Sequence, residues 1–258
     1  MLLSLYLSQF LVFLLVLTRI SGLVMTAPIL SMTSAPLKVR AMLAIGLSLV
    51  MTPMYVDDVP DLPANLVMLV LLMGREAVIG LSLGLSIKIL FAGLQLTGQI
   101  VGQMSGMSLA DVFDPNFNSS VPMFAQLLDI VALAVFVCIG GHRQVMHLLL
   151  GTFQFMPPGT ADFSTDLVTA ITTVTTQSFA LGIRAAAPAM VALLLSVLIL
   201  GLISRTLPQL NILAVGFSLN SAVMLVALAL SLGSAIWIFE DHAAAAMEVV
   251  SNAFFRQP

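Results

Sequence analysis

Gly80, Ser82 and Gly84 form a G-x-S-x-G pattern, which presents the serine nucleophile in many hydrolases. That chemistry requires a turn from a strand into a helix, because the hydroxyl must be exposed beside an oxyanion hole. Here the five residues lie inside a long apolar stretch that predicts a continuous helix. We therefore interpret them as a helix-packing surface rather than as the centre of an intramembrane hydrolase, and we expect no catalytic residues.

The three histidines, His142, His147 and His242, are the candidate metal ligands. His142 and His147 are five residues apart, whereas two ligands on one helical face are four apart, as in H-E-x-x-H. Cys138 is the single cysteine, so the sequence holds neither a disulfide framework nor a thiolate cluster. The sequence also lacks a glycine-rich phosphate-binding loop with its lysine. We expect no metal and no cofactor.

Several polar side chains interrupt the apolar stretch from Leu66 to Ser105. A charge that faces lipid at the bilayer centre costs about 3 kcal/mol or more, so these groups should face protein or water. One interpretation, which we favour, is structural pairing with neighbouring helices. The other is a proton-coupled carrier of small solutes that also uses Asp129. The polar residues of this stretch are Arg75, Glu76, Lys88, Gln95, Gln99 and Gln103, and the three glutamines are four apart, on one helical face.

The composition indicates a membrane protein. Of the 258 residues, 60% are hydrophobic and 8% are charged, whereas soluble domains carry about 25% charged residues. The net charge of −3 argues against nucleic-acid binding, because the sequence has no basic stripe to neutralise phosphates. The first 18 residues contain no Lys or Arg, so we expect the first apolar stretch to be a retained membrane helix rather than a signal peptide.

Six apolar stretches predict an all-α integral membrane protein, since the alternating ten-residue segments of a barrel are missing. They are Leu2–Pro28, Leu37–Tyr55, Leu66–Ser105, Val121–Phe155, Leu167–Ser204 and Leu210–Phe239. The third would be about 60 Å long as a helix, twice the thickness of a hydrocarbon core. We therefore predict long, partly broken helical hairpins. Either the long stretches break, with Gly140-Gly141 and Pro188 as candidate points, or they leave the bilayer and are covered by protein.

The charged residues between the stretches predict a topology. Basic residues follow the first and fifth stretches, and acidic residues follow the second and fourth. The positive-inside rule then places Arg40 and Arg205 in the cytoplasm and the N-terminus outside. The residues concerned are Lys38, Arg40 and Arg205 on one side, and Asp57, Asp58, Asp61, Asp162 and Asp166 on the other.

Gly98, Gly102 and Gly106 are spaced four apart at the end of the third stretch, a pattern that lets two helices pack closely. The polar, turn-rich segment Gly106–Pro122 follows, with two carboxylates and no basic residue. At membrane depth such a backbone is tolerated where it is buried or lines a water-filled cavity. An ordinary solvated loop is the alternative.

Three segments resemble the FliR family, the flagellar type III export-gate subunits, and their virulence-type SctT counterparts. They are APLKVRAMLA (Ala35–Ala44), GQIVGQMSGMSLADVFDP (Gly98–Pro115) and APAMVALLLSVLILGLISRTLPQLNILAVGFSLN (Ala187–Asn220). The most specific piece is Pro208-Gln209-x-Asn211 followed by Val215-Gly216-Phe217, and Arg205 also belongs to the family motif. The chain departs from the family at Gly106-Met107, where Gly-Phe is common, and at Ser218-Leu219-Asn220, where Pro-Leu-Lys is common.

The resemblance implies a non-enzymatic subunit of the export gate, present as one copy with five FliP and four FliQ subunits. It implies a channel for unfolded flagellar proteins in the bacterial inner membrane, within the ring of the basal body. FlhB would lie at the channel entrance and FlhA below it. Residues 1–258 would form one export-gate domain, with a FliP-like part over about 1–165 and a FliQ-like part over about 166–258. The segment Pro208–Asn220 favours a flagellum over an injectisome.

The resemblance also implies that Gly106–Pro122 enters the channel as a plug. Apolar side chains would seal the narrow pore by excluding water, and the two carboxylates would face the wetter lumen. Asp114-Pro115 would fix the turn. The expected sealing residues are Met107, Leu109, Val112 and Phe113, and the carboxylates are Asp111 and Asp114.

Overall fold

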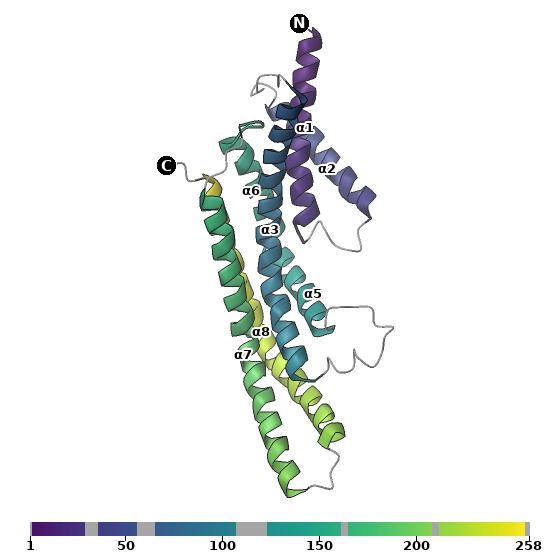
Figure 1. Cartoon of the computed structure of the whole chain (residues 1–258), viewed down its shortest axis with the longest axis vertical. Coiled ribbons are helices and arrows are strands. Elements are labelled where there is room, and N and C mark those ends of the chain that lie inside the picture. Colours follow the sequence, from purple (N-terminus) through teal and green to yellow (C-terminus); the bar gives the residue numbers. More distant parts are fainter. Residues whose placement is uncertain are drawn as a thin grey trace. The chain divides into compact units, whose positions relative to one another are not determined.

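The computed structural model describes residues 2–28, 36–55, 65–106, 123–160, 165–207 and 212–255. Every regular element in these ranges is a helix (Figure 1), so the all-α prediction is confirmed. The elements are α1 (Leu2–Thr26), α2 (Leu37–Met51) with the 3₁₀ turn η1 (Thr52–Tyr55), α3 (Leu66–Met104), α5 (Met123–Cys138), α6 (Gly141–Phe155), α7 (Thr165–Thr206) and α8 (Ile212–Phe255).

The helices follow the six predicted stretches because long apolar runs in lipid can satisfy their backbone groups as helices. Four described helices are long and apolar enough to cross a membrane, and up to six spans result if each broken pair is one span. The longest helices have 39, 42 and 44 residues. They measure about 60 Å or more at 1.5 Å per residue. This length exceeds what a hydrocarbon core requires.

The two predicted break points behave differently. Gly140 has φ 76°, a left-handed conformation that suits glycine, and it separates α5 from α6 as predicted. The break predicted at Pro188 is wrong, since α7 continues through it from Thr165 to Thr206. A proline removes one backbone donor from the helix, and α7 continues without this hydrogen bond. Ala185 and Ala189, which flank Pro188, are buried.

The last helix extends beyond the last apolar stretch. Helix α8 does not stop at Phe239 but continues to Phe255, with a bend between Leu230 and Ala235. The segment beyond Phe239 begins with charged residues and is then rich in alanine. Alanine has the highest helix propensity, and Ala243, Ala246 and Val250 supply a buried face at helical spacing. The segment beyond Phe239 is apolar enough to pack in a protein core but too polar to resemble a membrane span.

The chain divides into two compact units that alternate along the sequence. Unit 1 comprises Met1–Ile89, Gly140–Thr175 and Ala244–Pro258, and unit 2 comprises Leu90–Ile139 and Thr176–Ala243. Helices α3, α7 and α8 contribute residues to both units. Each unit has its own core, and the two cores use different side chains.

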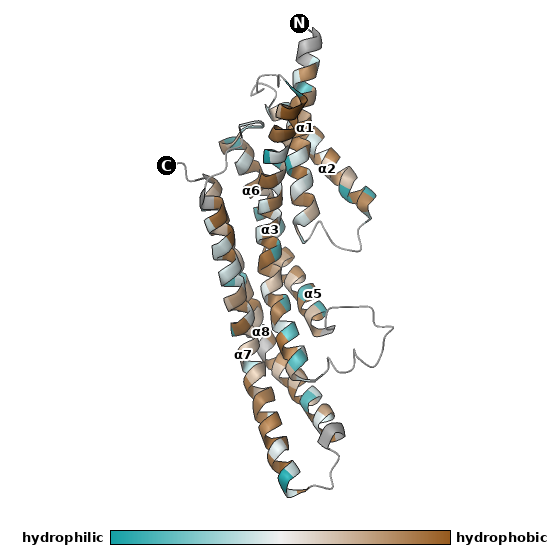
Figure 2. Ribbon diagram, in the orientation of Figure 1, coloured by the Kyte–Doolittle hydropathy of each residue, from teal (hydrophilic) through white to brown (hydrophobic). Residues whose placement is uncertain are grey.

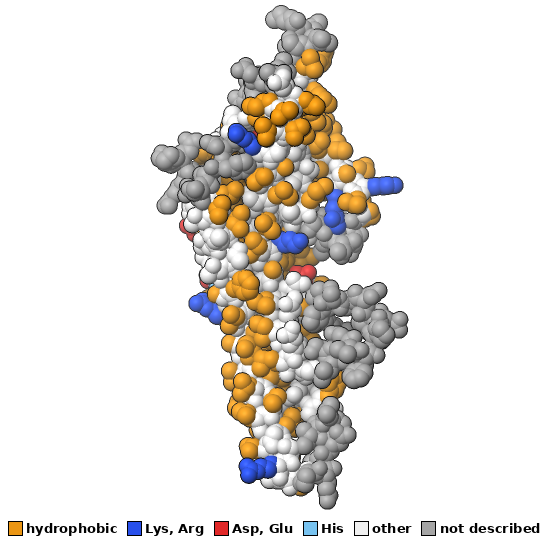
Figure 3. All heavy atoms as spheres, in the orientation of Figure 1, with side chains coloured by type: hydrophobic (Ala, Val, Ile, Leu, Met, Phe, Trp, Pro, Cys, Tyr) orange, Lys and Arg blue, Asp and Glu red, His pale blue; other side chains and the backbone are white. Residues whose placement is uncertain are grey.

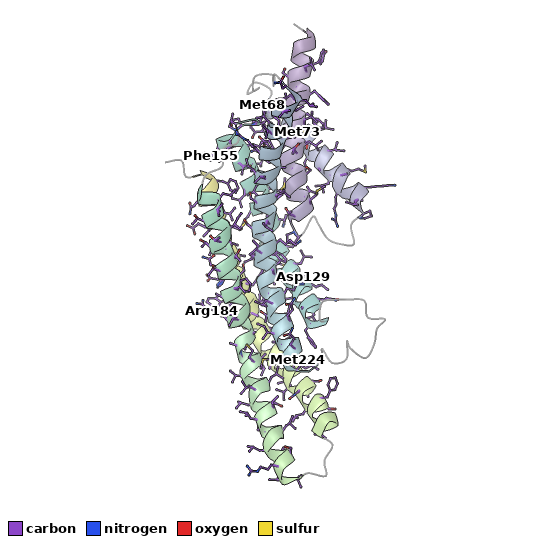
Figure 4. All side chains as sticks on the ribbon, viewed as in Figure 1. Met68, Met73, Asp129, Phe155, Arg184 and Met224 are labelled. Atoms are coloured by element: carbon purple, nitrogen blue, oxygen red, sulfur yellow. The ribbon has the colours of Figure 1, made fainter. Side chains whose placement is uncertain are left out.

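In unit 1, α1 lies beside α3 (Figure 1), where Leu11, Leu15 and Leu72 form a buried cluster. Leu69 and Met73 pack against this cluster from α3, and Met73 is labelled in Figure 4. In unit 2, a cluster from α3, α7 and α8 surrounds Met224 (Figure 4) and consists of Val101, Ala186, Ala189, Leu193 and Met224. The cores therefore form where two or three long helices meet along apolar faces.

Many large apolar side chains remain exposed on the single chain. Within the apolar windows that could cross a membrane, 22% of α2 and 28% of α7 are buried, against 61% of α3. Figure 2 shows mostly apolar residues along the C-terminal half of α7, and Figure 3 shows hydrophobic side chains spread over the visible face with few charges between them. A helix that is apolar all round requires lipid or another protein around it. Helix α3 is the covered element, whereas α2 and α7 expose apolar surface.

Candidate functional site

A buried ion pair joins α1 to α3 in unit 1. The Nε atom of Arg19 donates to Oε2 of Glu76 at 2.5 Å, and both side chains have no exposed surface. The two residues are 57 positions apart in the chain, yet each occupies the inner face of its helix. Desolvating two charges is costly unless the pair has good geometry and further hydrogen bonds. The surroundings of the pair provide those bonds.

The end of α6 completes the hydrogen bonding of both charged groups. Arg19 donates from Nη2 to the carbonyl oxygen of Met156 at 3.0 Å and from Nη1 to Oγ1 of Thr152 at 3.4 Å. The backbone N–H of Gly159 donates to Oε1 of Glu76 at 2.8 Å. Both carboxylate oxygens therefore accept a bond, and all three guanidinium nitrogens donate one. Both charged side chains are fully buried, and their polar atoms nevertheless all have hydrogen-bond partners within the protein.

An aromatic ring covers the guanidinium group. The Cζ atom of Arg19 lies 4.1 Å from the ring centroid of Phe153, which itself contacts Tyr55 with 5.5 Å between ring centroids. A desolvated cation over an aromatic face is stabilised by about 2 kcal/mol. The positive charge also lies at the C-terminal end of α6, where the helix dipole favours a cation. The cluster thus ties η1, α1, α3 and α6 together.

Glycines bring α1 and α3 close enough for the ion pair to form. A Cβ on Gly80 would collide with the carbonyl of Arg19, and one on Gly84 would collide with the side chain of Thr26. A Cβ on Gly22 would lie 2.9 Å from the carbonyl oxygen of Ala77, closer than real contacts allow. We call Gly22, Gly80 and Gly84 the glycine groove. Its backbone contacts confirm that the G-x-S-x-G pattern is a helix-packing surface.

Ser82 has no nucleophile geometry. Its hydroxyl donates to the carbonyl oxygen of Ile79 at 2.8 Å, within the same helix, and the residue is 4% exposed. No turn from a strand precedes it in the described part of α3. His142 and His147 are exposed on α6, and the described residues hold no group of three possible metal ligands.

The polar residues predicted in the third stretch separate into different environments. Glu76 is fully buried, Gln95 and Gln99 are half-buried, and Arg75, Lys88 and Gln103 are exposed on this chain. Asp129 is exposed on α5, and Arg184 is exposed on α7; Figure 4 labels both. Glu76 belongs to the ion pair in unit 1, whereas Asp129 belongs to unit 2.

The three predicted packing glycines also differ. A Cβ on Gly98 would lie 2.5 Å from Cα of Ala125, so α5 begins in backbone contact with α3. Gly102 is buried. Gly106 has φ 79°, and no described atom lies within 4 Å of the position of its Cβ. In the described residues, Gly106 thus acts through its left-handed backbone beyond the end of α3 rather than through close packing.

The sequence analysis missed a second close approach, between α3 and α7 in unit 2. A Cβ on Gly93 would lie 2.5 Å from the carbonyl oxygen of Ser178, and one on Gly182 would lie 2.6 Å from that of Gly93. The hydroxyl of Thr97 donates to the carbonyl oxygen of Gly182 at 3.0 Å. Gly93 and Thr97 are four apart, which is the signal that could have identified this face.

The predicted plug residues from Met107 to Pro115 lie outside the described residues, and so do Pro208, Gln209 and Asn211 of the family motif. The described part of that motif lies at the ends of α7 and α8. Arg205 is exposed in the last turn of α7, Gly216 is buried and Phe217 is exposed. The hydroxyl of Ser196 donates to Oδ1 of Asn220 at 2.7 Å. Asn220, where lysine is common in the family, therefore bonds to α7.

Arg19 is the site residue that sequence reasoning missed. It is the single charged residue in the 25 residues of α1. An arginine in the middle of an apolar helix is costly unless it is paired, so its position alone predicts an acidic partner. Glu76 is the acidic residue of α3. Because each charge is costly in an apolar helix without a partner, pairing Arg19 with Glu76 would have predicted that α1 and α3 are neighbours.

Comparisons with known proteins agree with the resemblance. Residues 10–246 match the family described as bacterial export proteins, family 1. The flagellar biosynthetic protein FliR of Escherichia coli strain K12 is 32% identical over 209 residues, which cover 80% of this chain and 78% of that protein. FliR of Pectobacterium carotovorum is 30% identical, with 83% and 81% covered. FliR of Bacillus subtilis strain 168 is 29% identical, with 84% of each chain covered.

Proposed function

Because the chain belongs to the bacterial export proteins, family 1, we propose that it forms a protein export channel together with FliP-like and FliQ-like subunits. The chain is a membrane component of the flagellar export apparatus. The channel would carry unfolded flagellar proteins across the bacterial inner membrane, within the basal body. FlhB-like and FlhA-like proteins would complete the path on the entry side.

The exposed apolar surface of the long helices is the observation that carries this proposal. Helix α7 has 42 residues, about twice the length that a hydrocarbon core requires, and most of its apolar window is exposed on the single chain. Leu198 and Leu202, which are four apart, are 56% and 68% exposed. Lipid can cover only about half of such a helix. Neighbouring subunits are therefore expected to cover the remainder.

The proposed assembly contains one copy of this chain with five FliP-like and four FliQ-like subunits. A FliP-like part over about 1–165 and a FliQ-like part over about 166–258 would let the chain occupy one position of each ring of homologous neighbours. The long α7 and α8 of the second part form an antiparallel pair joined through Ser196 and Asn220. Such a pair is the repeating unit expected of a FliQ-like hairpin.

The length of the segment between α3 and α5 supports a plug. Gly98 contacts Ala125 at the start of α5, so the gap from the end of α3 at Met104 back to α5 is about 9 Å, the helical rise over the six residues after Gly98. An extended chain covers that gap with about three residues. Residues 107–122 number 16. The excess length is available to reach into a channel, and nothing in the connection of the two helices requires it.

No specific observation favours the carrier. Both carboxylate oxygens of Glu76 accept hydrogen bonds within the chain, so the acidic group proposed for proton transfer is already engaged. The remaining candidates, Arg75, Lys88 and Asp129, are exposed on this chain. The export channel therefore stands as the proposed function.

Co-expression tests the proposed function. The chain carries an affinity tag and is expressed alone or with FliP-like and FliQ-like proteins from the same organism, and native mass spectrometry weighs the purified material. We expect degradation or aggregation of the chain alone, and a 5:4:1 complex with both partners. A chain that purifies alone as a stable, monodisperse monomer, and that fails to retain either partner, would contradict the proposal.

A further inference from the structure

The α1–α3 interface is smooth where the two backbones meet. At Gly22, Gly80 and Gly84 no side chain stands between the helices, and each helix contacts backbone or a short side chain of the other. Large side chains normally fix the alignment of two helices by inserting into gaps between opposing residues. A groove of small residues allows close approach but resists sliding less than interdigitated side chains do.

A second alignment of α1 keeps only part of this groove. Gly80 and Gly84 are four residues apart, so they occupy one face of α3 about 6 Å from each other along the axis. If α1 moved by one turn toward the C-terminus of α3, the backbone of Arg19 would meet Gly84 instead of Gly80. Thr26 would move from Gly84 to Lys88, whose Cβ would crowd it, so the last turn of α1 would have to move away from α3. The contact of Arg19 would again be a glycine, whereas the close contact of Thr26 would be lost.

The polar contacts distinguish the two alignments. In the shifted alignment Arg19 would leave Glu76 one turn behind and would lie beside Gly80 and Gly84, which offer no carboxylate. Its bonds to Thr152 and Met156 would be lost together with the ion pair, because these partners belong to α6 and its end. Leu15 would replace Arg19 opposite Glu76 and leave a buried carboxylate without its cation. Leaving one member of a buried pair alone is strongly destabilising.

We propose that the Arg19–Glu76 pair determines the register of α1 on α3, and that it transmits this register to the end of α6 through Met156 and Gly159. A buried ion pair often contributes little net stability compared with apolar residues of similar volume, whereas the selection of one register is an established use of buried polar groups. The pair thus adds to the register preference that the contact of Thr26 with Gly84 gives at one end of the groove.

The contacts also determine which member of the pair must be the cation and which the anion. The guanidinium group faces the carbonyl of Met156, and the carboxylate faces the N–H of Gly159. Exchange of the two residues would place an acceptor against the carbonyl and a donor against the N–H. The variant R19E/E76R therefore keeps both charges but reverses every bond to the end of α6. We expect it to fail where a simple charge pair would be restored.

Cysteine cross-linking in the co-expressed complex tests the register, in a background with Cys138→Ser. Leu15→Cys with Leu72→Cys reports the observed register, because both residues belong to one buried cluster. Thr26→Cys with Lys88→Cys reports the shifted register, because Lys88 lies one turn beyond the residue that Thr26 contacts. The measured quantity is the ratio of the two cross-linking yields in membranes treated with a copper oxidant.

The ratio is compared between the native pair and two variants. With the apolar replacement R19M/E76L, we expect the ratio of observed to shifted cross-links to fall about tenfold or more, at protein levels close to those of the native pair. The variant Glu76→Gln retains the size of the side chain and an acceptor for Gly159, and we expect a smaller fall in the same direction. If R19M/E76L does not accumulate, Glu76→Gln decides the question. An unchanged ratio in the variants that accumulate, or recovery of the native ratio in R19E/E76R, would overturn the proposal.

Discussion

Helix α3 packs closely against other helices in both units, but different chemistry accompanies the two contacts. In unit 1 the glycine groove lies beside a buried ion pair, Arg19 with Glu76. In unit 2 glycine contacts lie beside aromatic rings, where Phe91 meets Phe136 and Phe239 edge to face with ring centroids 5.4 and 5.6 Å apart. Glycines permit close approach in both units. We expect the edge-to-face rings to hold the alignment in unit 2, and the hydrogen-bonded charges to hold it in unit 1.

The difference follows from the shape of the side chains that are present. An edge-to-face ring pair is stabilised by about 1 kcal/mol beyond its buried area, and each ring also fills a gap that cannot be shifted without a clash. The α1–α3 interface has leucines at one end and glycines over Arg19 and Thr26. It therefore depends on polar bonds for alignment. The following predictions test this contrast, from the largest expected effect to the smallest.

Filling a glycine contact should have the largest effect in either unit. Gly80→Leu and Gly98→Leu would each insert a side chain into the backbone of a neighbouring helix, so we expect at least about a tenfold loss of assembled complex. Gly74→Leu is the matched control on α3, because nothing lies within 4 Å of its Cβ position. Complex yield from membranes measures the loss. Equal yields for Gly80→Leu and Gly74→Leu would contradict the close contact.

Truncating an aromatic ring should have the next largest effect, and in unit 2 alone. Phe91→Ala removes a ring that is 4% exposed and contacts two other rings, so we expect a loss of about 3–5 kcal/mol in the free energy of unfolding. Phe91→Leu restores most of the volume and should lose less than half of that. The midpoint of thermal unfolding of the co-expressed complex in detergent reports the difference between the two variants. If Phe91→Ala also lowers the cross-linking yield of the Leu15→Cys/Leu72→Cys pair, then packing in unit 2 affects the register of α1 on α3, which would contradict the contrast between the units.

Removing a single hydrogen bond between α3 and α7 should have the smallest effect. Thr97→Val retains the shape of the side chain but removes the donor to the carbonyl of Gly182, so we expect a loss of about 0.6 kcal/mol. Thr97→Ser retains the hydroxyl and is the control. The two unfolding midpoints in the same detergent are compared. A loss as large as that of Phe91→Ala would mean that polar bonds also determine the packing in unit 2.

The sequence predicted most of the helices because apolar length and lipid solvation leave few alternatives. The stretches Leu37–Tyr55 and Leu66–Ser105 correspond to the observed elements within one residue. Predictions from local sequence differed from the structure where packing against a neighbouring helix determined the course of the chain. Helix α7 continues through Pro188, with buried Ala185 and Ala189 on either side of it, and α8 extends to Phe255, where an alanine-rich segment has a buried face. Local sequence could not show these neighbours.

The candidate site was predictable only in part. Glu76 was identified as a group that required a partner, but Arg19 lies 57 residues away, and a sequence pattern does not join residues at that distance. Gly98 was identified by its spacing, whereas Gly93 and Gly182 were not, because their contact depends on the position of α7. The spacing that predicted packing for Gly106 coincided with a requirement for a left-handed backbone. Glycine spacing therefore indicates candidates, and the neighbouring helix selects among them.

The conductance of the assembled channel tests the central claim most directly. Complexes of this chain with its FliP-like and FliQ-like partners are reconstituted with the native segment 107–122 or with part of Ser108–Asn116 deleted. D111N/D114N is the control, since it retains the apolar side chains that would exclude water from the pore. We predict low conductance for the native complex and the control, and a large ion current for the deletion in complexes of unchanged composition. Unchanged conductance in intact, loop-deleted complexes would contradict the plug.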